Sequence, residues 1–222
     1  MHPLMSSLRH LLAEHPVLLL IDSASARVQA GLWTAGETAP PRWRTSDTEA
    51  GTGLFECVEA LLIDAGLRIA DVGAFVFCEG PGSVLGIRTA AVALRAWRVI
   101  NPGATTFAYQ SLDVVARSIN RPEVNVIADA RRDTWHVAKV NSPLQRIPSS
   151  ELHGDLVMPE HFRHWTPLPA NVTTTSYDLA ALLPRLCEAD LFRPVTGPDA
   201  FTHEDPTYVT WTPQIHQAPR GP

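Results

Sequence analysis

The sequence predicts an α/β protein made of two related lobes. In the first half of the chain, apolar and alternating segments give the order strand, strand, strand, helix, strand, helix. The second half then begins with another buried strand that, like the first strand, ends in an aspartate followed by a turn. The 222 residues, 45% of them hydrophobic, suffice for one large or two small cores.

The first lobe is expected to start with paired strands. Residues 17–21 form a buried apolar run that ends at Asp22, and residues 28–33 alternate apolar and polar side chains. Residues 42–45 are predicted to add a third short strand. Ahead of these strands, leucines within residues 4–12 recur at helical spacing, so a short amphipathic helix is one interpretation. We favour the other, a frayed N-terminal extension.

Two helices and a strand follow. Apolar residues recur at helical spacing over residues 54–65, and Gly66 is predicted to end that helix. A buried strand over residues 74–78 then leads, through Gly80-Pro81-Gly82-Ser83, to a helix over residues 84–99 with Ser83 as its N-cap. This second helix is apolar on two sides, so both sides must be covered, and another subunit can supply one cover.

The second half is predicted to contain shorter elements. We expect strands over residues 105–108, 124–128 and 171–174, and a hairpin partner around residues 135–140. Ser111 is predicted to cap a helix that continues to residue 116, and a further helix is expected over residues 177–189.

Bulk properties exclude several classes of protein. The formal net charge is -5 and the isoelectric point is near 6.0, which argues against binding nucleic acid by overall electrostatic attraction. The three cysteines are scattered and form no Cys-x-x-Cys pair, which indicates a reducing, cytoplasmic location. No apolar run is long enough to span a membrane.

Four segments of the chain, taken in order, resemble the TsaB (YeaZ-type) protein family. Residues 17–25 resemble its opening strand and turn, and residues 80–88 are similar to its central signature. Residues 111–116 resemble the helix that follows, and residues 129–132 the turn of the second lobe. Tyr208, after Pro206, matches the end of the family pattern more weakly.

The resemblance implies an actin-like (ASKHA) fold of two ribonuclease-H-like lobes. It divides the chain into an N-terminal extension (1–16), a first lobe (17–108), a second, degenerate lobe (109–210) and a C-terminal tail (211–222). It also implies a non-catalytic scaffold that pairs with a TsaD-like catalytic subunit and a TsaE-like ATPase. The complex threonylcarbamoylates the tRNA adenosine next to the anticodon.

The implied complex uses ATP and Mg²⁺, whereas this subunit is expected to bind no cofactor itself. It would meet tRNA indirectly, and pairing with a second copy is left open for the isolated chain. The predicted partner interface lies on the two long helices and comprises Leu54, Val58, Leu61, Leu62, Val84, Leu85, Arg88 and Val92. Two vestigial phosphate-type loops comprise Asp22, Ser23, Ser25, Gly80, Gly82, Ser83 and Gly86.

The loop from Gly80 has two interpretations. Glycines before a helix N-terminus can receive an anion, and they can equally form a tight packing corner, which we favour. No lysine and hydroxyl follow at the spacing of a P-loop. Asp22 likewise can hold Mg²⁺ through water, but we favour a strand-end carboxylate that accepts local N–H groups.

No residue is predicted to be catalytic or to bind a metal. The first turn lacks glycine and the chain has no Gly-Gly pair, so its backbone cannot readily approach a triphosphate. His161 and His164 do not have the spacing of a metal motif. Asp129, Arg131 and Arg132 form a charged turn, interpreted either as a solvated hairpin start or as a contact to a partner or to tRNA phosphate.

Two alternatives to the scaffold remain. One is a small active actin-like ATPase, kinase or acyltransferase that uses Asp22 and the Gly80 loop. The other is a repurposed paralogue with a different partner, since Val84, Leu85 and Ser46 depart from the family pattern.

Overall fold

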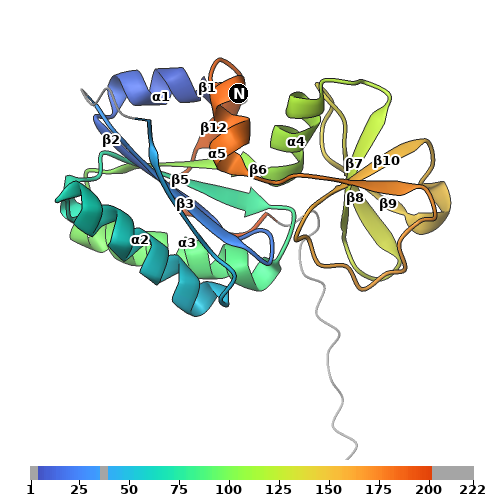
Figure 1. Ribbon diagram of the computed structural model, residues 1–222, viewed down its shortest axis with the longest axis horizontal. Helices are drawn as coiled ribbons and strands as arrows, with labels where there is room; N and C mark the ends of the chain where they lie inside the picture. The colour runs from blue at the N-terminus through green and yellow to red at the C-terminus, as the bar shows by residue number, and fades with distance from the viewer. Residues whose placement is uncertain (1–4, 36–39, 202–222) are drawn as a thin grey trace, which may run out of the picture.

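The protein contains two β-sheets that lie side by side (Figure 1). The structure is a computed structural model and describes residues 5–35 and 40–201. The predicted tail (211–222) and Tyr208 lie outside the described residues. Two sheets with intervening helices confirm the α/β class expected from the sequence.

The large sheet has seven strands. In spatial order they are β1 (Ser6–Ser7), β12 (Asp190–Pro194), β6 (Thr105–Gln110), β5 (Ala74–Gly80), β2 (Val17–Asp22), β3 (Val28–Thr34) and β4 (Arg42–Ser46). The strands β6, β5 and β2 run parallel, and every other neighbouring pair is antiparallel. The strand β12 belongs to the predicted second lobe (109–210) by sequence, but it pairs within the large sheet.

The small sheet has five strands and repeats the plan of the large one. Its order is β11 (Val172–Thr175), β10 (Asp155–Pro159), β7 (Val124–Asp129), β8 (Thr134–Ala138) and β9 (Gln145–Pro148). Read from the opposite edge, β9-β8-β7-β10-β11 has the same order and the same strand directions as β4-β3-β2-β5-β6. Strands β2 and β7 thus occupy equivalent places, and Asp22 and Asp129 are their last residues.

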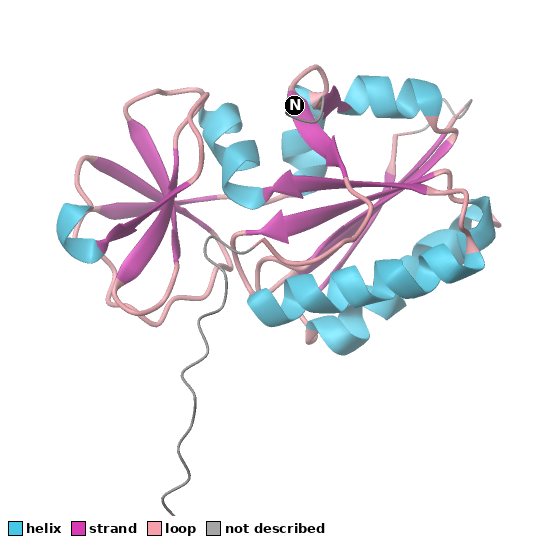
Figure 2. Ribbon diagram, turned by 180° about the vertical axis from the view of Figure 1, so that it is seen from behind, coloured by secondary structure: helices cyan, strands magenta, loops and turns pink. Residues whose placement is uncertain are grey.

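Helices cover both faces of the large sheet. The long helices α2 (Ala50–Ala65) and α3 (Val84–Ile100) lie next to each other on one face, as Figure 2 also shows. The opposite face carries α1 (Leu8–Glu14), α4 (Ser111–Ile119) and α5 (Leu179–Leu182) (Figure 1). The 3₁₀ helices η1 (Ile69–Asp71), η2 (Ser149–Glu151) and η3 (Leu183–Leu186) complete the fold.

Strand β2 is apolar from Val17 to Ile21 because both of its faces are covered. Leu19 and Ile21 pack in the core beneath α2 and α3, whereas Leu18 and Leu20 pack in the core on the other face. Parallel central strands of this kind read as continuous hydrophobic runs rather than as alternating ones. The same packing explains why β5 is buried from end to end.

The prediction of a frayed N-terminal extension is wrong for residues 6–14. Ser7 caps α1 by accepting a hydrogen bond from the N–H of His10, and β1 pairs with β12. Leu8 and Leu11 are buried in the core. The helical spacing of the leucines was therefore the informative signal, because it marks the face that packs on the sheet.

Two predictions for the second half also need correction. Ser111 does not cap α4; its hydroxyl instead donates to the carbonyl of Pro81 at 2.6 Å, and Gln110 is the N-cap residue. The helix expected over residues 177–189 is shorter, since α5 ends at Leu182 and the 3₁₀ helix η3, which contains Pro184, follows directly. Proline has no N–H with which to continue the α-helical hydrogen bonds.

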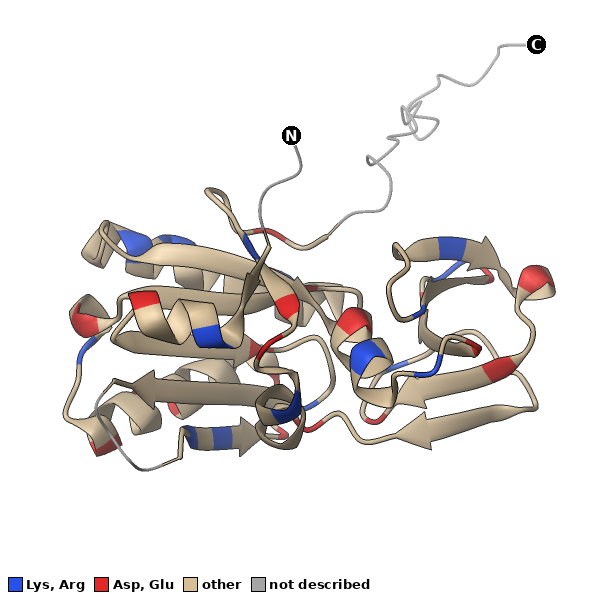
Figure 3. Ribbon diagram, turned by 90° about the horizontal axis from the view of Figure 1, so that it is seen from above, with Lys and Arg blue, Asp and Glu red and all other residues tan. Residues whose placement is uncertain are grey.

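Acidic and basic positions are interspersed over both parts of the molecule, as Figure 3 shows, in keeping with the modest net charge. Within the described ranges, none of the helices combines the length and the hydropathy that crossing a bilayer would require.

Candidate functional site

The candidate site lies where β2 and β5 end and α3 begins. The two strands pair in parallel, with Ile21 opposite Phe77, so their carboxyl ends meet at one edge of the large sheet. Asp22 ends β2 and Gly80 ends β5, which brings the two predicted loops together. In sheets of this class ligands usually bind at such an edge.

The Gly80 loop packs directly on the turn after Asp22. The N–H of Ser83 donates to the carbonyl of Ala24 at 2.6 Å. A Cβ atom on Gly82 would lie 2.3 Å from that same carbonyl oxygen, and Gly82 has a φ of +154°. A Cβ atom on Gly86 would lie 2.2 Å from the carbonyl oxygen of Ser23. Glycine is therefore required at both positions for two stretches of backbone to touch.

The start of α3 is stabilised within the chain. Ser83 is the N-cap, as predicted, and its Oγ accepts a hydrogen bond from the N–H of Gly86. The Gly80–Pro81 peptide is cis, and the Pro81 carbonyl accepts the hydrogen bond from Ser111. The geometry of this loop is that of a packing corner.

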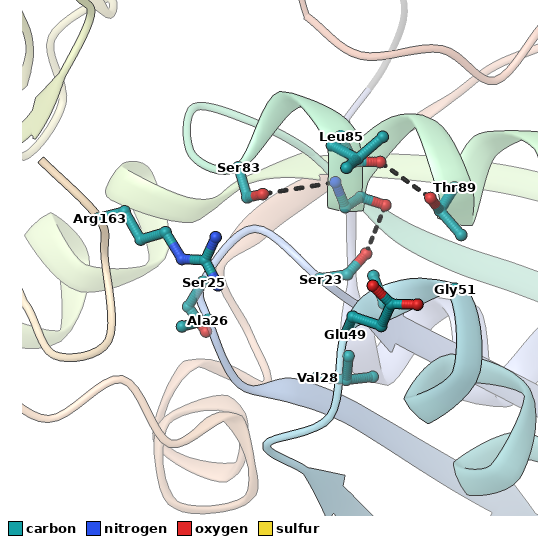
Figure 4. Close-up of a pocket in the computed structure, with 12 residues that line it drawn as sticks. Ser23, Ser25, Ala26, Val28, Glu49, Gly51, Ser83, Leu85, Thr89 and Arg163 are labelled. Carbon is teal, nitrogen blue, oxygen red and sulfur yellow. Dashed lines mark hydrogen bonds between the residues drawn. The ribbon is translucent and has the colours of Figure 1, made fainter. Parts of the chain in front are cut away.

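A cavity of about 340 Å³ opens beside this corner (Figure 4). It is lined by the turn after Asp22, by the first residues of α2 and α3, and by Arg163 from the loop after β10. Ser23 Oγ donates to the Gly86 carbonyl at 2.9 Å, and Ser25 Oγ donates to the Arg27 carbonyl at 2.8 Å. Glu49 also lines the cavity and opposes the charge of Arg163, so the lining has no net preference for anions.

Asp22 is fully buried, and both of its oxygens are occupied. Oδ1 accepts from the N–H of Ala24 at 3.0 Å, which confirms the predicted local contact. Oδ2 accepts from the hydroxyls of Tyr109 at 2.6 Å and Tyr177 at 2.7 Å. Desolvation raises the pKa of Asp22 above its ordinary value, although these hydrogen bonds act to lower it. The carboxylate is thus committed to the protein's own groups.

The tyrosine partners of Asp22 were not predicted. Tyr109 lies in β6 and Tyr177 just before α5, far from Asp22 along the sequence. A buried hydroxyl requires a hydrogen-bond partner, but the sequence does not indicate which one. Within residues 5–35 and 40–201, no three histidine, cysteine or acidic side chains gather as metal ligands.

Asp129, at the end of β7, has a different environment. Its Oδ1 accepts from the N–H of Arg131 at 2.5 Å, and its Oδ2 accepts from those of Trp165 at 2.6 Å and Thr166 at 2.7 Å. Burial acts to raise the pKa of Asp129, but the backbone N–H groups outweigh it and hold the pKa below its ordinary value.

The turn after Asp129 projects its arginines into solvent. Arg131, Arg132 and Asp133 all have positive φ, at 64°, 51° and 56°, and all three are exposed. The guanidinium of Arg131 lies 4.3 Å from the ring centroid of Trp165, whose side chain is 59% exposed. Cation–π contacts at solvent-exposed sites contribute little free energy. Both side chains are therefore accessible and only weakly held. Trp165 was not identified from the sequence.

The predicted interface residues fall into two groups. Leu54, Val58, Leu61 and Leu62 of α2 are buried in the core beneath the helix, so they are not available at the surface of the chain. Arg88 and the three apolar residues Val84, Leu85 and Val92 of α3 are exposed. Further exposed apolar side chains on these helices are Phe55, Ile63, Val99 and Ile100.

No family model and no curated protein matches the chain. The chain is, however, similar to solved structures. YeaZ from Pseudomonas aeruginosa superimposes with a TM-score of 0.57 at 18% sequence identity, covering 76% of this chain and 91% of that one. A protein described as uncharacterized, with similarity to peptidase YEAZ from Pseudomonas aeruginosa, gives a TM-score of 0.56 at 18% identity, covering 76% of this chain and 90% of that one. The chain therefore has a YeaZ-like fold.

Proposed function

We propose that this chain is a divergent member of the TsaB (YeaZ) family and acts as a non-catalytic subunit. It would pair with a TsaD-like catalytic subunit, together with a TsaE-like ATPase, in threonylcarbamoylation of the tRNA adenosine next to the anticodon. The YeaZ-like fold supports the family, and the surface of α3 supports the role.

The repeated strand order supports an actin-like arrangement of two ribonuclease-H-like lobes. Each sheet has three antiparallel strands followed by two parallel ones in the same spatial order. The second lobe is degenerate in this description, because the long helices that follow β4 and β5 have no long counterparts after β9 and β10.

The observation that carries the proposal is an apolar stripe on the exposed side of α3. Leu85, Val92 and Val99 are 79%, 57% and 83% exposed. They follow one another at intervals of seven residues, which places them along one side of the helix, as in a coiled-coil seam. Contiguous apolar surface of this kind is usually covered by a partner. A helix from another subunit fits this spacing.

The charges on α3 indicate what that partner helix carries. Arg88 and Arg95 lie on the same exposed side as the stripe, and neither forms an ion pair with any described residue. Unpaired arginines beside an apolar seam favour a helix with leucines or valines flanked by acidic residues.

A second copy of the chain is the alternative occupant when the catalytic subunit is absent. Helix α2, next to α3, exposes Phe55 and Ile63 together with Glu56 and Glu59. In a two-fold dimer, α2 of one copy can face α3 of the other and match acidic side chains to Arg88 and Arg95.

The environment of Asp22 supports a non-catalytic subunit. Its two oxygens already accept three hydrogen bonds from the protein. A Mg²⁺ ion would have to displace both tyrosine hydroxyls from a fully buried site. The ATP and Mg²⁺ used by the complex are therefore assigned to the partner subunits.

The turn at Asp129 is proposed as a second contact surface. Arg131 and Arg132 form no ion pair with any described residue, and the oxygens of Asp129 accept hydrogen bonds from backbone N–H groups instead. They remain free to contact a partner's acidic groups or tRNA phosphate, and a tRNA contact at this turn would be limited to these two arginines.

Co-purification with the TsaD-like protein of the same organism tests the proposal. We expect a stable complex for the parent chain and for Leu168→Glu, which places a charge on an exposed apolar residue outside α2 and α3. Val92→Glu should weaken the complex by at least about tenfold, because it buries a charge in the seam. Failure of two folded parent proteins to associate would overturn the pairing.

The active-enzyme alternative rests on the 340 Å³ cavity beside α3. Calorimetry of the isolated chain with Mg-ATP separates the two functions. A scaffold should give no heat of binding, whereas micromolar binding that is lost in Arg163→Ala would favour an ATP-dependent enzyme. Deletion of the gene for this chain distinguishes the scaffold from a repurposed paralogue. The tRNA modification should disappear if the chain is the scaffold and persist if it is a repurposed paralogue.

A further inference from the structure

The turn between β2 and β3 is held by two segments from the other half of the chain. One is residues 161–162, in the loop after β10, and the other is residues 177–179, where the chain returns from the small sheet toward the large one. The segment 177–179 is deeply placed, since Tyr177 and Leu179 are both buried.

Gln29 makes the first tie. Its side chain is buried, and its amide forms two hydrogen bonds with the backbone of the returning segment. Nε2 donates to the carbonyl of Tyr177 at 2.8 Å, and Oε1 accepts from the N–H of Leu179 at 2.9 Å. This pattern imitates the pairing of a neighbouring β-strand, so Gln29 fixes the register of the segment against β3.

Asp22 makes the second tie. The hydroxyl of Tyr177, from the returning segment, and that of Tyr109, from β6, converge on the same oxygen of Asp22. One carboxylate therefore joins β2, β6 and the returning segment inside a fully buried site. Separating these groups would leave a buried acid and two hydroxyls without partners, which low-dielectric surroundings penalise strongly.

The loop after β10 makes the third tie. The N–H of Ala26 donates to the carbonyl of His161 at 2.7 Å. The ring of Phe162 meets that of Tyr177 edge to face, with 5.1 Å between their centroids. The two tying segments thus also contact each other.

We infer that this set of groups, which we call the polar seam (Asp22, Gln29, Ala26, Tyr109, His161, Tyr177 and Leu179), is a latch that holds the two sheets in one fixed arrangement. A protein that opens and closes around a ligand needs a few mobile residues at the junction of its lobes. Here the groups at the junction form hydrogen bonds with one another, and the side chains of Asp22, Gln29, Tyr109 and Tyr177 are buried. The chain therefore presents the exposed side of α3 and the turn at Asp129 as parts of one rigid body.

Distances between spin labels in the isolated chain test the latch without any partner, so the outcome does not depend on the proposed function. Labels on Ala13→Cys in α1 and Lys139→Cys after β8 report on the two sheets, and both positions are exposed. Cys187→Ser removes the one partly exposed cysteine, since Cys57 and Cys78 are buried. Labelled chains are diluted with unlabelled ones, which suppresses distances between copies.

We expect one narrow distance distribution for the labelled parent. Tyr177→Phe with Gln29→Ala should broaden the distribution or add a second distance. Ser149→Ala is the matched control, because it removes a hydrogen bond from Trp135 within the small sheet and leaves the seam intact. A broad distribution in the parent, or an unchanged narrow one in the folded double variant, would overturn the latch.

If the double variant does not fold, Tyr177→Phe alone serves, because it removes a single oxygen atom. Hydrogen exchange then supplies the second measurement. The N–H groups of Leu179 and Ala26 should exchange at least about tenfold faster in Tyr177→Phe than in the parent, while those of β8 stay unchanged. Equal exchange at all of these positions would contradict the latch.

Discussion

Asp22 and Asp129 occupy equivalent places in the two sheets but have opposite environments. Asp22 is the last residue of β2 and Asp129 is the last residue of β7, and each is followed by a tight turn. Asp22 is closed off by two tyrosine hydroxyls, and burial raises its pKa. Asp129 is held by three backbone N–H groups, which keep its pKa low despite its burial.

The difference shows how one pattern serves two purposes. The turn after Asp22 faces inward and joins parts of the protein, whereas the turn after Asp129 faces outward and exposes two arginines. Both sequences have a buried strand that ends in an aspartate followed by a turn. Whether a turn is buried or exposed depends on residues far away in the chain, such as Tyr109 and Tyr177 around Asp22.

The largest expected effect of this difference is on stability. Asp22→Ala leaves two buried hydroxyls and one N–H without an acceptor, so we expect it to lower the free energy of unfolding by about 3–5 kcal/mol. Asp129→Ala should cost only about 1–2 kcal/mol, because water can reach the N–H groups it exposes. Urea denaturation measures both, with Glu59→Ala, at an exposed acidic residue of α2, as the control. Equal losses of unfolding free energy for Asp22→Ala and Asp129→Ala would contradict the difference between their two environments.

The backbone of the two turns should respond in opposite directions. Gly82→Ala places a Cβ atom against the Ala24 carbonyl at a positive φ, and we expect a loss of about 2–4 kcal/mol. Arg132→Gly relieves a positive φ in the exposed turn and should be neutral or stabilise by up to about 1 kcal/mol. Thermal unfolding of the two variants checks the signs, and a stable Gly82→Ala would show that the corner is loosely packed.

The pH dependence of stability should also have opposite signs. The pKa of Asp129 is lowered on folding, so its stabilising contribution is present above the unfolded pKa and is lost as the pH falls through the folded pKa. The pKa of Asp22 is raised, so stability falls as the pH rises from 3.8 toward the folded value.

Asn substitutions separate these two contributions. Asp129→Asn should flatten the loss of stability on acidification, and Asp22→Asn should remove the decrease in stability that accompanies rising pH. Urea midpoints measured between about pH 3 and pH 7 report both slopes. Identical slopes for the two variants would contradict the assigned environments.

The smallest effect is expected at the outer turn. Trp165→Ala removes an exposed cation–π contact with Arg131 and should lower stability by about 0.5–1 kcal/mol. Trp165→Phe keeps an aromatic ring and should recover most of that loss. A loss above about 2 kcal/mol would mean that Trp165 supports the fold rather than the surface.

The sequence predicted those parts of the site that depend on neighbouring residues. The buried strand over residues 74–78, the cap at Ser83 and the helix end at Gly66 were all found as expected. Each follows from local backbone geometry, such as the left-handed φ of 66° at Gly66. The contact of Asp22 with the N–H of Ala24 belongs to the same class.

The parts that the sequence did not predict depend on distant segments meeting. Tyr177 reaches Asp22 only because the chain returns to the large sheet, and Ser111 bonds Pro81 because the end of β6 lies beside the corner. The burial of Leu54 and Leu61 is similar, since periodicity marks an apolar face without saying whether the sheet or a partner covers it.

The return of β12 to the large sheet determines the order in which the chain can assemble during synthesis. Strand β6 is made early, but its free edge is paired only by β12, which is made after all five strands of the small sheet. The small sheet can therefore form while the large one still has an open edge. Nascent chains stalled before Asp190 should expose the unpaired edge of β6, and such an edge can pair with other chains and aggregate. Ribosome-associated chaperones would need to shield this edge until β12 is made.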